Sequence, residues 1–374
     1  MAVRYRQTMY RQAIIGAGVV GLTLAEALSQ RFPGETMLLL EQGSVAAQGA
    51  SAVPVALLNP YRGRSARAQP RDLAGLQQMH RLAASLDAQG LPSGMHFSGV
   101  LRIASNRKQA KTWRSRPGLQ PLAPCDLPAM YHAPYEGFLA AQGGWLEPHR
   151  LLASLKQVVQ QRGVHIHTQC RLHAVLEQTG GYRLESSQGS YEAEQVWLCI
   201  GADSLPTLPA PAYAQAHTLA LQRLAGEVLR LQAPNHDSHA MPYALAGAIY
   251  AAATPEAVYV GGNHRDAQQD DPSAAAQLHK AAAWFLPPLQ HYQCKQVWTG
   301  VRAKTADNAP RVLELQPGLV FVGAMAGRGF LVAAHVAAQL AAQLSHGGRL
   351  PPEGMPTSLI DDPVIDDPAI NNRD

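Results

Sequence analysis

Residues 12–28 read Gln-Ala-Ile-Ile-Gly-Ala-Gly-Val-Val-Gly-Leu-Thr-Leu-Ala-Glu-Ala-Leu and decide the fold of this chain. An apolar strand enters a G-x-G-x-x-G turn, and an alanine- and leucine-rich helix leaves it. A second apolar run, residues 37–40, ends in Glu41. Gly16 permits the tight turn, Gly18 lets a pyrophosphate approach the backbone, and Gly21 lets the helix pack close to the strand. The pattern predicts a βαβ unit that binds a dinucleotide.

The chemistry of the predicted unit indicates which parts of the dinucleotide it holds. The N-terminus of the helix offers free N–H groups and a positive dipole end to the phosphates. Glu41 suits the two hydroxyls of an adenosine ribose and would repel the additional phosphate of NADP. At this point both NAD and FAD remain open.

Length and composition describe a globular protein. The chain has 374 residues, of which 47% are hydrophobic and 16% are charged, and this length favours two intertwined domains. We expect no membrane span, because apolar runs stay below the roughly 18 residues that one needs. The basic start, residues 1–11, leads into the glycine turn and not into a cleavage site, so we expect no signal peptide and a cytoplasmic location.

Cysteines and histidines show no metal-binding pattern. The four cysteines are widely spaced and form no C-x-x-C, so neither a disulfide framework nor a zinc site is indicated; they are Cys125, Cys170, Cys199 and Cys294. His165 and His167 alternate along an expected strand and share a face, but no third ligand lies near them in the sequence. We predict no metal site.

Charge is distributed unevenly. Residues 351–374 carry a formal net charge of −5 and read as a loosely ordered acidic tail, whereas residues 1–350 carry +9. Two basic clusters form either a solvated face or a surface for a polyanion such as RNA. Their members are Arg62, Arg64, Arg67 and Arg71, and then Arg102, Arg107, Lys108, Lys111, Arg114 and Arg116.

The loop after Glu41 gives the first family resemblance. Residues 49–60 read Gly-Ala-Ser-Ala-Val-Pro-Val-Ala-Leu-Leu-Asn-Pro. The chain here resembles the FAD-dependent D-amino-acid oxidase, glycine oxidase and sarcosine oxidase superfamily. Within it, the loop is similar to G-A-S-G-N-P-x-G-x-L-x-P in the FAD domain of the bifunctional enzyme that modifies the methylaminomethyl-thiouridine of tRNA. Ala52, Val53 and Ala56 depart from the Gly, Asn and Gly of that pattern.

The last third carries the second resemblance. Residues 298–310 read Trp-Thr-Gly-Val-Arg-Ala-Lys-Thr-Ala-Asp-Asn-Ala-Pro, similar to the superfamily's W-x-G-x-R-x-x-T-x-D-x-x-P. The resemblance implies that Arg302 binds a substrate carboxylate by two parallel hydrogen bonds. Arg328, in the glycine turn before a long helix, would serve substrate, flavin or both, and Tyr250 matches an aromatic position near the substrate.

The resemblance also implies the fold and the cofactor. It predicts a Rossmann-like FAD-binding domain, residues 1–85, 145–212 and 300–350, with an interleaved antiparallel-sheet substrate domain, residues 86–144 and 213–299. We expect residues 104–140 to form an irregular or helical insertion. FAD would be bound non-covalently, because no cysteine lies near Arg328 and Cys294 reads as sheet core. The expected FAD-binding residues are Gly16, Gly18, Val20, Gly21, Glu41, Gln42, Ala50, Ser51, Leu57, Leu58, Leu172, Gly201, Gly327, Arg328, Gly329, Phe330 and Leu331.

The implied reaction is oxidation of a C–N bond next to a carboxylate. The substrate would be a small carboxylate-bearing amine, an amino acid or an N-substituted glycine. Hydride would pass to flavin N5, the imine would hydrolyse, and oxygen or another acceptor would take the electrons. One alternative is a stand-alone relative of the tRNA enzyme that acts on the carboxymethylaminomethyl group of a wobble uridine. Another is a flavin-binding module without turnover.

Overall fold

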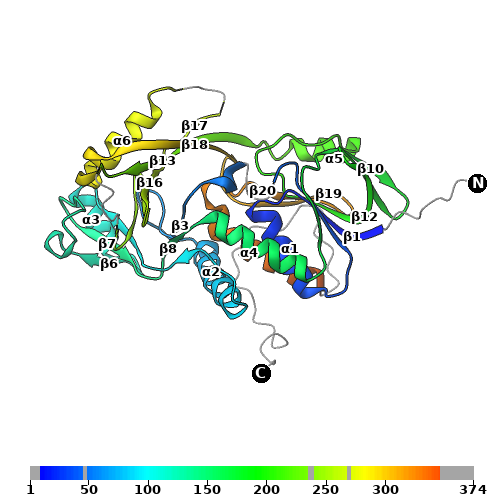
Figure 1. Cartoon of the computed structure of the whole chain (residues 1–374), viewed down its shortest axis with the longest axis horizontal. Coiled ribbons are helices and arrows are strands. Elements are labelled where there is room, and N and C mark those ends of the chain that lie inside the picture. Colours follow the sequence, from blue (N-terminus) through cyan, green and yellow to red (C-terminus); the bar gives the residue numbers. More distant parts are fainter. Residues whose placement is uncertain (1–8, 45–48, 235–239, 268–270, 346–374) are drawn as a thin grey trace, which may run out of the picture.

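The computed structural model describes residues 9–44, 49–234, 240–267 and 271–345. Two large sheets lie toward opposite ends of an elongated molecule (Figure 1). The predicted acidic tail, residues 351–374, lies outside the described residues. The mixed α/β class predicted from the sequence is confirmed.

The first sheet has a parallel centre built around the N-terminal strand. The strand order is β9-β2-β1-β12-β20, and each neighbouring pair is parallel. The strands span His165–His167, Met37–Leu40, Met9–Ile15, Gly189–Leu198 and Leu319–Gly323. Every residue of β2 and β20 is buried, as expected for strands covered on both faces. The predicted βαβ unit is therefore present.

Antiparallel strands extend this sheet. β10 (Leu172–Gln178) and β11 (Gly181–Ser186) form a meander with the first half of β12, and β19 (Arg311–Gln316) pairs with β20. The short helix α5 (Ala210–His217) buries Ala212 and Ala216 against this part.

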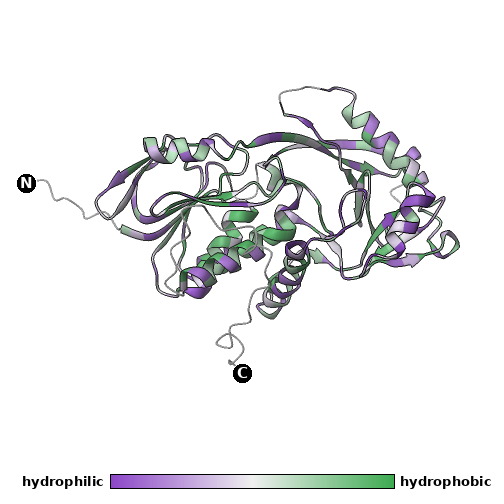
Figure 2. Ribbon diagram, turned by 180° about the vertical axis from the view of Figure 1, so that it is seen from behind, coloured by the Kyte–Doolittle hydropathy of each residue, from purple (hydrophilic) through white to green (hydrophobic). Residues whose placement is uncertain are grey.

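Helices α1 (Val19–Arg31), α4 (Pro148–Gln161) and α7 (Gly329–Ser345) pack together under the parallel centre. α1 and α7 are mainly green in Figure 2, because their apolar side chains form the main core together with the buried face of α4. α2 (Pro70–Ala88) crosses α7 at Gly75, where an added Cβ would lie 2.3 Å from the Leu331 carbonyl oxygen. This close crossing fixes the start of α7.

The second sheet has the order β17-β13-β16-β15-β14-β5-β7-β6, with β18 added on β13. It is antiparallel except for β5 and β14, which run parallel. Helices α3 (Arg107–Arg114) and α6 (Ala274–Phe285) lie at this end (Figure 1). The strands span Arg265–Asp266, Gln222–Gln232, Ala257–Gly261, Tyr250–Thr254, Ala244–Ala246, Val100–Ile103, Gly137–Ala140, Gln120–Leu122 and Gln293–Lys304.

Strand β18 connects the second sheet to the nucleotide-binding end. It pairs with β13 almost throughout and continues through the predicted domain boundary at residue 300. At Gly300 an added Cβ would lie 3.6 Å from Ala50 Cα, so the strand runs close to the loop after β2. A small sheet, β3 (Ala56–Leu58), β8 (Gly144–Leu146) and β4 (Met95–His96), lies beside it. The predicted domain boundaries stay a prediction.

Two local expectations are wrong. Residues 104–140 contain strands β6 and β7 of the second sheet as well as α3, because Phe138 and its neighbours are buried against β5. Cys294 is exposed near the start of β18, where the strand's first five residues face solvent, and is not in the sheet core.

Candidate active site

The glycine turn is shaped by two close backbone approaches. Gly16 has φ +103°, and a Cβ there would lie 2.6 Å from the Cys199 carbonyl oxygen. A Cβ on Gly21 would lie 1.8 Å from the Gly16 carbonyl oxygen, so only glycine allows α1 this close to the turn. A Cβ on Gly18 would lie 3.2 Å from Ser51 Oγ. The turn is thus a cradle that side chains at these positions would fill.

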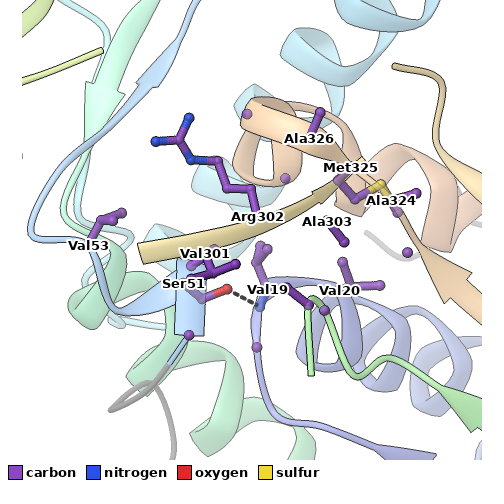
Figure 3. A pocket seen from close by; sticks show the side chains of 18 of the residues that line it. Val19, Val20, Ser51, Val53, Val301, Arg302, Ala303, Ala324, Met325 and Ala326 are labelled. Carbon is purple, nitrogen blue, oxygen red and sulfur yellow. Dashed lines mark hydrogen bonds between the residues drawn. The ribbon is translucent and has the colours of Figure 1, made fainter. Parts of the chain in front are cut away.

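The first turn of α1 faces the same space. The Val19 N–H donates to Ser51 Oγ (3.1 Å), which ties the loop after β2 to the helix start (Figure 3). The first N–H groups of a helix have no acceptor within it, and they carry its positive dipole end. Val19 and Val20 line the cavity at this point, so the positive end of the helix faces it, an arrangement that favours an anion.

Glu41 is held at the end of β2 by two backbone donors. The Ala17 N–H donates to Oε2 (2.7 Å), and the Gly43 N–H donates to Oε1 (2.8 Å). A carboxylate oxygen accepts more than one hydrogen bond, so both oxygens can still accept from ribose hydroxyls. Beside it, the side-chain amide of Gln42 donates to Asp203 (2.8 Å).

A cavity of about 1210 Å³ runs from this turn to β15, β18 and the start of α7. It exceeds the roughly 300–1,000 Å³ of ordinary small-molecule sites, as an extended dinucleotide together with a substrate requires. Of the predicted site residues only Gly21 and Leu58 do not line it. Gly21 lies behind the turn, and the Leu58 side chain is fully buried in the core because β3 alternates and turns Leu57 to the cavity. Leu58 thus does not line the cavity, and its predicted role in FAD binding stays a prediction.

Arg302 enters the cavity from β18. Figure 3 shows its side chain on the opposite side of the strand from Val301 and Ala303, and Ala303 points toward Val20. Its Nη1 lies 2.9 Å from Nδ1 of His264, which therefore accepts the hydrogen bond as a neutral imidazole. Partial burial lowers the pKa of His264, and the cations Arg302, Arg62 and Lys304 lower it further.

Tyr250 stands in β15 beside this pair. Burial raises the pKa of its phenol to about 12, although Arg302 opposes the rise, so the hydroxyl is a donor at neutral pH. Gly261 in β16 makes room for the ring, because a Cβ there would lie 2.4 Å from Tyr250 Cζ. Arg302 and Tyr250, both predicted, thus line one wall of the cavity.

Arg62 also faces the cavity, which the sequence did not indicate. A Cβ placed on Gly327 would lie 3.3 Å from Arg62 Nη2 and 3.8 Å from Arg302 Nη1, so these nitrogens are at most about 7 Å apart. Two unit charges at that distance repel by roughly 2 kcal/mol at an effective dielectric of 20. Burial lowers the pKa of Arg62 to about 10, and Arg328 and Arg302 add to this effect while Asp72 opposes it. Within the described part of the chain neither Arg62 nor Arg302 has an ion-pair partner.

Arg328 lies differently from Arg302. Its guanidinium is buried, its Nη1 is 3.3 Å from Asp72 Oδ1 and 3.5 Å from Gln69 Oε1, and its Nη2 donates to the Asn308 carbonyl. The side chain ties α2 to the start of α7. Although Arg328 lines the cavity, its donors are engaged by protein, and its predicted role toward substrate or flavin stays a prediction.

The second half of the 298–310 motif builds the turn that Arg328 contacts. Asp307 Oδ1 accepts from Thr305 Oγ1 (2.7 Å) and from the Ala309 N–H (3.0 Å), and its Oδ2 is 2.8 Å from Arg311 Nη2. Asn308 takes φ +57° inside this turn, which presents its carbonyl to Arg328. The Thr and Asp of the motif are therefore structural.

Three members of the predicted basic clusters, Arg62, Arg71 and Arg102, are not on a solvated face. Arg71 and Arg102 are buried, and Arg102 donates to the carbonyls of Tyr61 and Gly63 while its Cζ lies 4.7 Å from the Trp113 ring centroid. The exposed members are Arg64, Arg67, Arg107, Lys108, Lys111 and Arg114. The two clusters meet where Trp113 Nε1 donates to the Arg64 carbonyl (3.0 Å).

The described residues hold neither a candidate metal site nor a candidate membrane span. They contain no group of three or more His, Cys, Asp or Glu side chains that could hold a metal ion. His165 and His167 instead each meet a tyrosine hydroxyl, of Tyr10 and Tyr191. None of the helices within this part is long and apolar enough to cross a membrane.

Sequence reasoning did not single out Arg62 and His264, which line the cavity beside Arg302. Arg62 lies in a run of basic residues, and nothing in the sequence distinguishes it from its neighbours. His264 follows β16 in Gly-Gly-Asn-His. Its only signal was that this turn follows a strand that faces the cavity.

The family follows from residues 11–344, which match the model of the DAO family, FAD dependent oxidoreductase. The chain belongs to this family and is an FAD-dependent oxidoreductase, as the resemblance predicted. The glycine cradle, Glu41 and the length of the cavity fit that cofactor.

Among curated relatives, the chain is 28% identical over 340 residues to the tRNA 5-methylaminomethyl-2-thiouridine biosynthesis bifunctional protein MnmC of Maricaulis maris, with 90% of this chain and 52% of that protein covered. It is 26% identical to the same-named protein of Polaromonas naphthalenivorans, with 93% and 58% covered. The chain thus spans little more than half the length of these relatives.

Solved structures show the same fold. Glycine oxidase from Geobacillus kaustophilus matches with a TM-score of 0.75 at 19% identity, covering 91% of this chain and 95% of that one. L-proline dehydrogenase from P. horikoshii matches with a TM-score of 0.76 at 14% identity, covering 92% and 95%.

Proposed function

We propose that this FAD-dependent oxidoreductase oxidises the C–N bond of an amino acid or N-substituted glycine. The observation that carries the proposal is the pairing of Arg302 with the neutral Tyr250 hydroxyl at one wall of the cavity, next to the start of α7. A guanidinium and a phenol together bind a carboxylate well, since both donate and one is charged. The α-carbon of the bound substrate is thereby fixed relative to the cavity.

The cofactor would be held by residues along the cavity. Glu41 would accept from the ribose hydroxyls, the N–H groups at the start of α1 would bind the pyrophosphate, and the start of α7 would hold the ring system. FAD bound there without a covalent bond accepts a hydride and so supplies the two-electron oxidation.

The protein's own residues contribute to the reaction by aligning the substrate. Arg302 and Tyr250 orient the carboxylate, and His264 holds Arg302 Nη1 at 2.9 Å, which restricts the guanidinium to one plane. No general base is required, because the amine reacts neutral and loses hydride from its α-carbon. The C=N bond so formed takes up water and splits into an amine and a carbonyl acid. Oxygen or another acceptor then removes the two electrons.

A reduction assay tests the proposal. The purified protein, mixed anaerobically with glycine, sarcosine and D-amino acids, is expected to lose its yellow flavin colour with at least one of them. Precipitation of the protein with acid should release the flavin into solution, since the attachment is non-covalent. A colourless protein that takes up no FAD, or a flavin that none of these amines reduces, would contradict the proposal.

A second candidate is the same chemistry on RNA, since a carboxymethylaminomethyl group on a wobble uridine is itself an N-substituted glycine. It is supported by the curated relatives named for tRNA 5-methylaminomethyl-2-thiouridine biosynthesis and by the exposed basic residues of α3. We expect tRNA carrying the group to reduce the flavin.

Charge reversal tests this candidate. The pair Lys108→Glu and Lys111→Glu on exposed α3 should weaken tRNA binding and reduce its salt dependence, because each phosphate contact contributes a slope of about one. Arg183→Glu on exposed β11, in the other sheet, is the control. Equal effects of both, or no salt-sensitive binding by the unaltered protein, would exclude tRNA.

A further inference from the structure

The arginines that line the cavity differ in their hydrogen-bond partners: Arg328 and Arg102 are buried and Arg62 is half-buried. Arg328 has Asp72 and the Asn308 carbonyl, and Arg102 has the carbonyls of Tyr61 and Gly63. No protein acceptor lies within hydrogen-bond distance of the Arg62 guanidinium in the described part of the chain, and Arg62 nevertheless lines the cavity. An uncompensated charge in such a place is costly unless an anion binds there.

The backbone of Arg62 is held rigidly in place. Arg102 donates to the carbonyl of the residue before Arg62 and to that of the residue after it. Asn59 adds hydrogen bonds to both the N–H and the carbonyl of Tyr61 (3.1 and 2.9 Å), and Arg62 forms an antiparallel bridge with Arg67. A charge presented from a backbone fixed on both sides is preorganised for a ligand.

We propose that the cavity binds a substrate with a second carboxylate, that Arg62 holds it, and that the preferred substrate is a compact dicarboxylate amine. This inference rests on the proposed function, in which Arg302 holds the carboxylate next to the oxidised carbon. Arg62 is then the residue that selects between dicarboxylate and monocarboxylate amines.

The distance between the Arg62 and Arg302 guanidinium groups suits two carboxylates on one small molecule. Arg62 Nη2 and Arg302 Nη1 are at most about 7 Å apart, across the face of Gly327. In an amine with two carboxymethyl groups, the carboxyl carbons are about 5 Å apart when extended, given C–C and C–N bonds of about 1.5 Å. Each carboxylate of such a molecule can therefore reach its own guanidinium. For iminodiacetate, oxidation of one C–N bond and addition of water give glyoxylate and glycine.

Binding without turnover gives the first test. Thiodiacetate and (methylthio)acetate differ by one carboxylate and contain no amine to oxidise. We expect thiodiacetate to perturb the flavin spectrum of the holoenzyme with a Kd at least about 30-fold lower than that of (methylthio)acetate, as for a charge pair removed from water. Arg62→Gln should abolish the difference. Arg67→Gln, exposed and on the other strand of the same bridge, should preserve it.

Turnover gives the second test. Arg62→Gln is expected to lower kcat/KM for iminodiacetate by roughly 30-fold or more and that for sarcosine by less than about threefold. An equal loss on both substrates would mean that Arg62 and Arg302 share one carboxylate, and would overturn the proposal. So would equal affinity of the unaltered protein for the two thioethers, or loss of FAD from Arg62→Gln.

The dicarboxylate proposal and the proposed function give different results when they fail. If sarcosine reduces the flavin but Arg62→Gln does not discriminate between substrates, only the dicarboxylate proposal is wrong. If neither amine reduces the flavin and neither thioether binds, the proposed function fails, and the assignment of Arg62 fails with it.

Discussion

Arg328 and Asp72 form a buried ion pair that joins the start of α7 to α2, with Arg328 Nη1 3.3 Å from Asp72 Oδ1. Burial raises the pKa of Asp72, while Arg328, Arg62 and Arg71 lower it. The carboxylate therefore compensates the positive charge of Arg328 and of the neighbouring Arg62 and Arg71. Removing it would leave Arg328 buried without its counter-charge.

Asp72→Asn is accordingly expected to destabilise the protein by about 3 kcal/mol, the typical cost of breaking a buried pair from one side. Urea unfolding at neutral pH measures it. Asp87→Asn, exposed on the same helix, is the control and should change the free energy of unfolding by less than about 0.5 kcal/mol. Similar values for the two variants would show that the pair contributes little.

Arg302→Ala is expected to lower kcat/KM for carboxylate substrates by about 100-fold or more, because it removes a charge-assisted bidentate contact that aligns the substrate. The yellow colour should remain. Stopped-flow reduction of the flavin measures the loss, and Tyr250→Phe should show a smaller loss, of about tenfold, mainly in KM. Release of FAD from Arg302→Ala would place this residue in the cofactor site instead.

Gly21→Ala is expected to disrupt the nucleotide-binding turn, since its Cβ would lie 1.8 Å from the Gly16 carbonyl oxygen. Gly34→Ala, beyond the other end of α1, has φ +89° and open space around the position, so it should cost only about 1 kcal/mol. Thermal unfolding and FAD retention compare the two. Should both variants lose stability equally and keep FAD, the close packing of α1 would not be essential.

The carboxyl group of Asp307 is expected to make the free energy of unfolding depend on pH. Hydrogen bonds from the Ala309 N–H, Arg311 and Thr305 hold the pKa of this carboxyl well below its usual range. A depressed pKa adds stability that is fully present above the unfolded value of about 3.9 and is lost as the pH falls below it. The advantage of the unaltered protein over Asp307→Asn should therefore be constant from pH 7 to about 5 and shrink toward pH 3. An advantage that grows on acidification would contradict the assignment, as measured by urea unfolding across that range.

Much of the fold and part of the candidate site could be predicted from local sequence patterns. Gly16, Gly21 and Glu41 could be predicted because their roles depend on neighbours within one βαβ unit. Arg302 could be predicted because its motif resembles that of a family. The position of Leu57 facing the cavity and Leu58 facing the core depends on strand register, which the loop sequence does not reveal.

The remaining parts of the candidate site depend on contacts between segments that are far apart in the sequence. Arg62 reads as one more basic residue in a run, and it turns inward because Arg102, on another strand, holds the carbonyls on either side of it. Arg328 is engaged by Asp72 on α2 and by Asn308 in the turn after β18. Charge and spacing along the sequence do not determine such pairings, so the contacts of Arg62 and Arg328 could not be predicted.

The order of strands in the first sheet also bears on how the protein is made. β1 pairs with β2, which follows it closely in sequence, but Ile15 also pairs with Leu198, and Leu198 pairs with Phe321, so the parallel centre of the sheet is complete only after residue 321 has been made. Until β20 is translated, the end of β12 lacks this neighbour, and until α7 is translated, α1 lacks one of the helices that pack against it. Contacts so far apart in sequence slow folding and expose apolar surface meanwhile. A chain truncated before Gly329 lacks α7 and leaves the apolar surface of α1 uncovered, so we expect it to aggregate.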